Sequence, residues 1–236
     1  MKAITLSIVG SVILVGMIFS TNSAEAAVVN SAISKNYINF IADEGMTKPV
    51  DPANPDNPAL PSPIDPIDPD NGGTGNSGSL TLDYVSNIHF GTQKIMGGNT
   101  TYNANNKDPY VQVSDKRGTG EGWALTAKAS ELKISTGEPL QGAELTFKNG
   151  QVKSQSSNVS EPPTAYDVTF DNRDSKKFMD APLETGRGTW LDVFSGSDSD
   201  NSNVQLKVLA GSAESESYSG TVTWELTNAP SQILNK

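Results

Sequence analysis

The fold is decided by a stretch near the end of the chain, Tyr218-Ser-Gly-Thr-Val-Thr-Trp224-Glu-Leu226-Thr-Asn-Ala-Pro230. Between Tyr218 and Leu226, tyrosine, glycine and apolar residues fall on every second position, and polar residues fill the alternates. This period is typical of a half-buried strand with one apolar face. Pro230 ends the pattern, because proline has no N–H to donate to a neighbouring strand. The stretch therefore predicts a β-strand with Trp224 and Leu226 on one face.

A second Trp-x-Leu motif occurs at Trp123-Ala-Leu125. We expect each motif to place its indole and its leucine on one side of a strand, and the two strands to be neighbours in one sheet. Two roles are open for these four side chains, a ligand-contacting surface or the structural core. A large aromatic residue on the apolar face of a strand is more often core, which is the favoured placement here and also for Trp190.

Further alternating stretches predict roughly eight to ten short strands between residues 80 and 227. Asn149-Gly150 is a pair that favours tight hairpins. Residues 127–132 could make one helical turn, but no stretch keeps a helical period for three turns. The predicted fold is an all-β sandwich or barrel-like domain over residues 79–236, with candidate strands around Leu80–Tyr84, Val111–Val113, Ala143–Phe147, Val168–Phe170, Trp190–Phe194 and Val204–Val208.

Three segments precede this domain. Residues 1–26 have a positive start, an apolar run from Ala3 to Phe19 and an Ala-x-Ala exit, which predicts a secretory signal cleaved before Ala27. A retained membrane anchor is the alternative. Residues 27–42 are a short segment whose alternating part, Asn36–Ile41, could add one strand. We expect no transmembrane anchor after cleavage, and the chain shows no sortase signal.

Residues 43–78 differ in composition from the rest of the chain. Asp-Pro and Asn-Pro pairs repeat, and a glycine-rich stretch follows from Asn71 to Gly78. Proline at this density favours an extended, disordered polyproline-like spacer. Seven acidic residues against Lys48 give this segment −6 of the chain's net charge of −10.

Composition excludes several classes of function. The chain has no cysteine, so a secreted form must be stabilised by packing alone. A net charge of −10 without a basic stripe argues against a nucleic-acid partner. The basic pairs Lys116-Arg117 and Lys176-Lys177 are expected to be ordinary surface charges.

No catalytic or metal site is expected. His89 is the only histidine, and no Ser-His-acid spacing is visible, so nucleophilic catalysis is unsupported. Asp192, Asp198 and Asp200 could in principle serve glycoside hydrolysis, but acid pairs arise by chance in a chain with 27 acidic residues. Ser195–Asn203 lacks the glycine and glutamate of a helix-loop-helix calcium site. We predict a non-enzyme without cofactors.

The chain resembles the WxL-domain surface proteins of low-GC Gram-positive bacteria. The resemblance rests on Leu80-Thr-Leu-Asp-Tyr-Val-Ser-Asn-Ile-His-Phe-Gly91, on Trp123-Ala-Leu125 and on the Trp224 stretch. It implies a secreted protein that attaches non-covalently to the cell wall, with peptidoglycan or another wall polymer as receptor. It also implies possible membrane-anchored or sortase-anchored protein partners. Assembly with such a partner is the alternative main function, and wall glycoside hydrolysis is a remote one.

Overall fold

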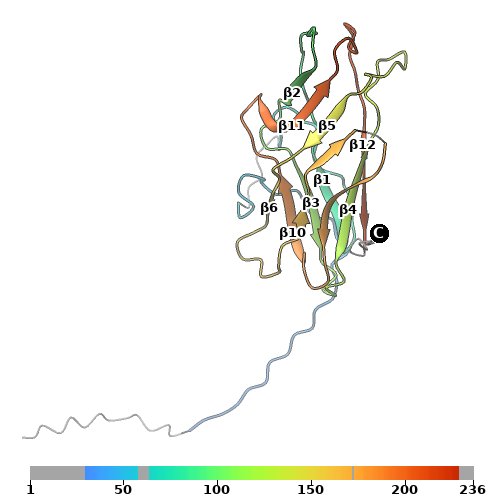
Figure 1. Ribbon diagram of the computed structural model, residues 1–236. Coiled ribbons are helices and arrows are strands. Elements are labelled where there is room, and N and C mark those ends of the chain that lie inside the picture. Colours follow the sequence, from blue (N-terminus) through green and yellow to red (C-terminus); the bar gives the residue numbers. More distant parts are fainter. Residues whose placement is uncertain (1–29, 58–63, 172, 229–236) are drawn as a thin grey trace, which may run out of the picture. The chain divides into compact units, whose positions relative to one another are not determined.

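The computed structural model describes residues 30–57, 64–171 and 173–228. Over these residues the chain contains twelve strands and no helix, which confirms the predicted all-β class. The strands form three antiparallel four-stranded sheets, and no barrel is closed within this part of the chain (Figure 1). The predicted signal peptide lies outside the described residues. Of the described residues, 30–39 and those from 40 onward belong to two different units, each described by itself.

Each sheet mixes strands that are distant in sequence. The first sheet has the order β1 (Leu80–Val85), β3 (Tyr110–Asp115), β10 (Gly188–Val193) and β6 (Gln151–Lys153). The second has the order β2 (Thr100–Ala104), β11 (Asn201–Val208), β5 (Glu144–Phe147) and β8 (Val168–Phe170). The third has the order β12 (Val222–Thr227), β4 (Trp123–Ala129), β9 (Lys176–Ala181) and β7 (Thr164–Ala165).

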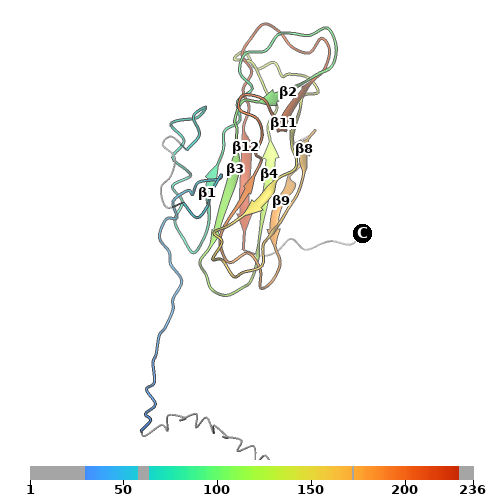
Figure 2. The ribbon, with the colours of Figure 1, turned by 90° about the vertical axis from the view of Figure 1, so that its left-hand side faces the viewer.

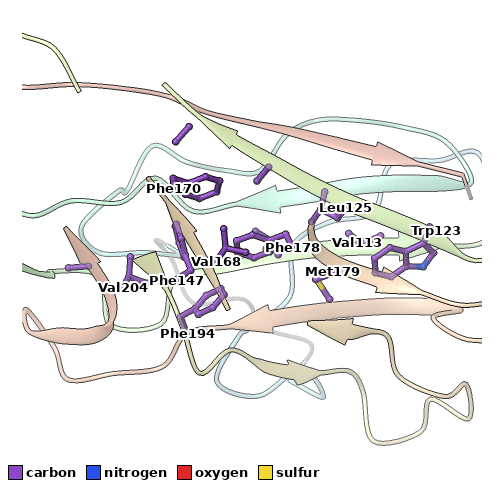
Figure 3. Close-up of a cluster of buried hydrophobic side chains, with 14 of the residues drawn as sticks. Val113, Trp123, Leu125, Phe147, Val168, Phe170, Phe178, Met179, Phe194 and Val204 are labelled. Atoms are coloured by element: carbon purple, nitrogen blue, oxygen red, sulfur yellow. The ribbon is translucent and has the colours of Figure 1, made fainter. Parts of the chain in front are cut away.

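A single aromatic-rich core joins the three sheets (Figure 3). The ring of Phe147 in the second sheet lies 5.5 Å from that of Phe178 in the third sheet and 5.3 Å from that of Phe194, which follows β10 of the first. These pairs meet edge to face, the geometry that aromatic quadrupoles favour. Because the core draws on all three sheets, residues 80–227 fold as one body.

Two local predictions are wrong. Residues 127–129 belong to β4 and form no helical turn. Asn149-Gly150 does not close a hairpin, because β5 and β6 lie in different sheets. Asn149 has a positive φ of 56°, and a Cβ on Gly150 would lie only 2.2 Å from Asp192 Oδ1. The pair thus lets the chain cross from the second sheet to the first past a buried carboxyl group.

Two segments before β1 differ from the sequence prediction. Residues 30–44 contain no strand, so the strand proposed at Asn36–Ile41 is not formed in this structure. The described residues between 46 and 78, here called the strap, do not extend away as a spacer. They lie beside β1 and pack on the outer face of the first sheet (Figure 2).

The strap is held by apolar contacts and by hydrogen bonds. Val50 and Ile64 pack against the buried cluster of Tyr84, Tyr110, Leu191 and Val193. The Val50 amide donates to Gln112 Oε1 at 2.8 Å, and Asn106 Nδ2 donates to Asp65 Oδ2 at 2.6 Å.

The Asp-Pro pairs explain why the strap turns back. Asp51 Oδ1 accepts a hydrogen bond from the Ala53 amide at 2.8 Å, and Asp65 Oδ1 accepts one from the Ile67 amide at 2.9 Å. Aspartate side chains that bond to the backbone two residues on stabilise turns. The repeat therefore builds turns where the sequence predicts an extended chain.

Candidate functional site

The two Trp-x-Leu motifs lie side by side. β4 and β12 pair antiparallel, with Leu125 directly opposite Leu226 and Trp224 opposite Ala127. Residues directly opposite each other in an antiparallel pair project to the same face. Both motifs therefore face the aromatic core, as expected for neighbouring strands of one sheet.

The first motif is entirely core. Trp123 and Leu125 are both 0% exposed. The indole Nε1 of Trp123 donates to the Gly186 carbonyl at 3.1 Å. Gly186 has a positive φ of 70°, and a Cβ there would lie 2.8 Å from Trp123 Nε1. Trp123 thus fits a closed cavity and cannot contact a ligand in this conformation.

The second motif lies at the boundary between core and solvent. Trp224 and Leu226 are half-buried, and the Trp224 ring meets Phe178 edge to face at 4.6 Å. Trp224 also lines a large groove, so part of its surface remains accessible. The two motifs, identical in spacing, therefore occupy different environments.

The groove runs between strands of the second and third sheets and has a volume of about 1440 Å³. Small-molecule sites usually measure roughly 300–1,000 Å³, so this groove has room for a segment of a polymer. One end carries Val222, Trp224 and Phe170 from the main core. The other end carries half-buried Phe90, Tyr102 and Tyr218, which pack on a separate cluster, and Phe90 also packs on the main core. The sequence did not predict any of these three aromatic residues as a binding residue, although Phe90 and Tyr218 lie in stretches quoted above.

The rim of the groove is polar and mildly acidic. Glu131 pairs with Arg173, whose hydrogen bond keeps the pKa of the Glu131 carboxyl below its ordinary value. Glu214 and Glu216 are exposed on the loop before β12, and Lys94 lies on the rim. Many of the other lining residues are serine, threonine, asparagine and glutamine. The groove thus combines aromatic faces with hydroxyl and amide groups.

The acids considered for hydrolysis form no catalytic pair. Asp192 is 0% exposed, whereas Asp198 and Asp200 are exposed on the loop before β11. None of the three lines the groove. In the part of the chain that the structure describes, no cluster of His, Cys, Asp and Glu residues could hold a metal ion. His89 lines the groove, and its backbone amide donates to Asn106 Oδ1 at 2.9 Å.

The basic pairs, Trp190 and the 195–203 segment, all considered in the sequence analysis, make ion pairs or hydrogen bonds within the fold. Arg117 Nη2 lies 2.7 Å from Asp115 Oδ2, and Lys116 Nζ lies 3.0 Å from Asp43 Oδ2. Lys176 and Lys177 pair with Asp171 and Asp180. Trp190 is 6% exposed and donates to the Arg187 carbonyl. In the 195–203 segment, the side-chain Nδ2 of Asn201 donates to the carbonyls of Asn106, Lys107 and Phe194.

Comparison with known families gives one clear match. A family model described as WxL domain surface cell wall-binding matches residues 27–230. The comparisons with curated proteins and with solved structures gave no match. Among the residues that the structure describes, no helix has the length and apolar character needed to cross a membrane.

Proposed function

The chain belongs to the WxL-domain surface cell wall-binding family, and from this premise we propose that it is a secreted protein held on the wall by non-covalent contact with peptidoglycan. Association with the cell surface follows from the family. The choice of peptidoglycan, and of the groove as its site, is our proposal. Membership by itself gives no reason to assign an enzymatic activity.

The observation that carries the proposal is the aromatic end of the groove. Phe90, Tyr102 and Tyr218 are half-buried there among exposed hydroxyl and amide groups. Aromatic rings supply apolar contact area for the C–H faces of sugars, and a few polar groups fix the orientation of a ligand. The hydroxyl group of Tyr102 donates to the Lys94 carbonyl at 2.7 Å, which holds its ring in place.

A groove of this kind supports weak binding at each site. The groove is open to solvent, and only parts of its aromatic rings are accessible. Retention on a polymer then depends on many copies binding many sites, since linked weak contacts give high avidity. Reversible, multivalent adhesion is therefore the mechanism that we propose.

Co-sedimentation of residues 27–236 with peptidoglycan sacculi stripped of teichoic acid tests this function. We expect the wild type to pellet, and Tyr102→Ala/Tyr218→Ala to lose about tenfold in apparent affinity, equivalent to about 1.4 kcal/mol. Tyr166→Ala, which truncates an exposed tyrosine outside the groove, is the matched control. Melting curves check that all variants are folded.

Two results would overturn parts of the proposal. Wild-type protein that stays in the supernatant at low and moderate salt would refute peptidoglycan binding. If that protein is then retained by protoplast membranes, which carry no wall, its ligand is a surface partner protein. Equal pelleting of the wild type and the double variant would place the wall contact outside the aromatic end of the groove.

A further inference from the structure

The buried side chain of Asn106 joins the strap to the wall of the groove. Asn106 lies between β2 and β3 and is 0% exposed. Its Nδ2 donates to Asp65 Oδ2 of the strap at 2.6 Å and to the Asn87 carbonyl at 3.0 Å, and its Oδ1 accepts from the His89 amide at 2.9 Å. Asn87 and His89 line the groove. The side chain of Asn106 therefore contacts the strap on one side and the groove wall on the other.

These partners allow the Asn106 side chain one orientation. The Asp65 carboxylate and the Asn87 carbonyl can only accept hydrogen bonds, whereas the His89 amide can only donate. Turning the side-chain amide over would set donor against donor at His89 and acceptor against acceptor at Asp65. The backbone behind this side chain is also held, because Asn201 Nδ2 donates to the Asn106 carbonyl at 3.0 Å. The carboxylate of the strap thus keeps Oδ1 of Asn106 directed at the groove wall.

The contact with His89 bears on an aromatic residue of the groove. The Asn105 amide donates to the His89 carbonyl at 2.7 Å, so residues 105–106 hold His89 through both of its backbone groups. Phe90 follows directly, lines the aromatic end of the groove, and packs on the main core and on the separate cluster there. A shift of the His89 backbone would therefore move the ring of Phe90.

A second contact of the strap supports the same wall. Asp68 Oδ2 accepts a hydrogen bond from Asn87 Nδ2 at 2.7 Å. Asp65 and Asp68 each begin an Asp-Pro pair, and Asp51 begins another. The carboxyl group of Asp51, in contrast, accepts hydrogen bonds from the amides of residues 53 and 54 in the strap itself. The Asp-Pro repeat thus contains one pair that bonds within the strap and two that reach the groove wall.

We propose that Asp65 is a positioning residue for wall binding: through Asn106 it holds the backbone that carries Phe90. The inference rests on the proposed function, since it takes the aromatic end of the groove as the peptidoglycan contact. Hydrogen bonds to a charged group are stronger than neutral ones, and burial of both side chains keeps water from competing for this one. The contact is separate from the apolar packing of the strap on the first sheet. The strap therefore contributes to the shape of the groove as well as to stability.

Hydrogen exchange at one amide tests the contact without wall material. His89 is the only histidine of the chain, so selective ¹⁵N labelling of histidine in untagged residues 27–236 gives one backbone amide signal. Asp65→Ala should raise the exchange rate of this amide about tenfold, because Asn106 loses the partner that orients it. Asp51→Ala, the matched control, removes the carboxyl group of another Asp-Pro turn and should leave exchange at His89 unchanged. Equal exchange rates in the wild type and Asp65→Ala overturn the proposal.

Co-sedimentation with stripped sacculi tests the effect on binding. At a temperature where the variant is fully folded, Asp65→Ala should lower the apparent affinity about fivefold. Asp68→Ala should lower it less, since its contact with Asn87 is exposed, and it carries the comparison if Asp65→Ala fails to fold. Asp51→Ala should bind like the wild type. Urea unfolding gives the loss of stability in each variant: a purely structural role would make affinity follow stability, whereas positioning lowers affinity only where a groove-wall contact is removed.

Two binding results contradict the proposal. Unchanged affinity of Asp65→Ala with faster exchange at His89 would mean that the groove binds without this contact. Equal loss of affinity in Asp65→Ala and Asp51→Ala would mean a general loosening of the strap. Wild-type protein that does not pellet refutes the proposed function, and the role of Asp65 in binding with it. The exchange rates need no ligand, so they then still show whether the strap holds the groove wall.

Discussion

Among the described residues, Asp192 carries a carboxyl group that is buried in the first sheet. It is 0% exposed, and neither carboxyl oxygen has a hydrogen-bond partner within the described structure. Burial raises the pKa of Asp192 to about 7, and the nearby carboxylate of Asp167 acts in the same direction. Asp192 is therefore held largely as the neutral acid below neutral pH, which lowers the cost of burying it beside Gly150.

This placement predicts a pH-dependent stability. Between pH 3.8, the unfolded value, and about 7, the folded state binds more protons than the unfolded state. The free energy of unfolding should therefore fall as pH rises, by at most about 4 kcal/mol, and level off above neutral pH. Asp192→Asn should flatten this slope in urea titrations across that range. Asp198→Asn, an exposed aspartate in the loop that follows β10, should retain it. Parallel curves for the wild type and Asp192→Asn would show that Asp192 does not titrate as proposed.

At the scale of elements, the paired strands β4 and β12 carry one motif in two environments. Trp123→Ala should cost about 4 kcal/mol, because it empties a closed site and leaves the Gly186 carbonyl without its donor. Trp224→Ala should cost only about 2 kcal/mol, because its ring is already partly in solvent. Urea unfolding measures both losses, with Val159→Ala on a 99% exposed side chain as the control. Equal losses would mean that Trp224 is as much a core residue as Trp123.

The period-two pattern predicted the strands with one apolar face. The expectation that β4 and β12 are neighbours came from the two Trp-x-Leu motifs, and it is confirmed. It missed β9, Lys176–Ala181, because Phe178, Met179 and Asp180 are all buried and alternation disappears. The half-buried placement of Trp224 could not be predicted either. It depends on β12 being an edge strand beside a groove, and sheet order is not encoded in local periodicity. Phe90, Tyr102 and Tyr218 converge only after folding, for the same reason.

At the scale of the molecule, the domain extends further toward the amino terminus than composition suggests. Proline density and acidic charge predicted a spacer over residues 43–78, yet Val50 and Ile64 complete a buried cluster with Tyr84 and Tyr110. The tyrosine rings stack at 4.3 Å beneath these two residues. The family match, which begins at residue 27, also includes this segment. We therefore propose that the strap is part of the folded unit and covers the outer face of the first sheet.

Val50→Asp/Ile64→Asp tests the strap directly. Each substitution replaces a packed apolar side chain with a charge, and the pair should cost about 3 kcal/mol, a loss on the order of 10 °C in melting temperature for a domain of this size. The near-ultraviolet circular dichroism of the tyrosines should weaken, because the cover over Tyr84 and Tyr110 loosens. Ala53→Asp adds a charge at an exposed strap position and should leave both readouts unchanged.

If the melting temperature of Val50→Asp/Ile64→Asp equals that of the wild type, the segment only bridges distance. A clear loss, with sacculus binding retained by the protein that remains folded, would separate the stabilising role of the strap from the adhesive role of the groove.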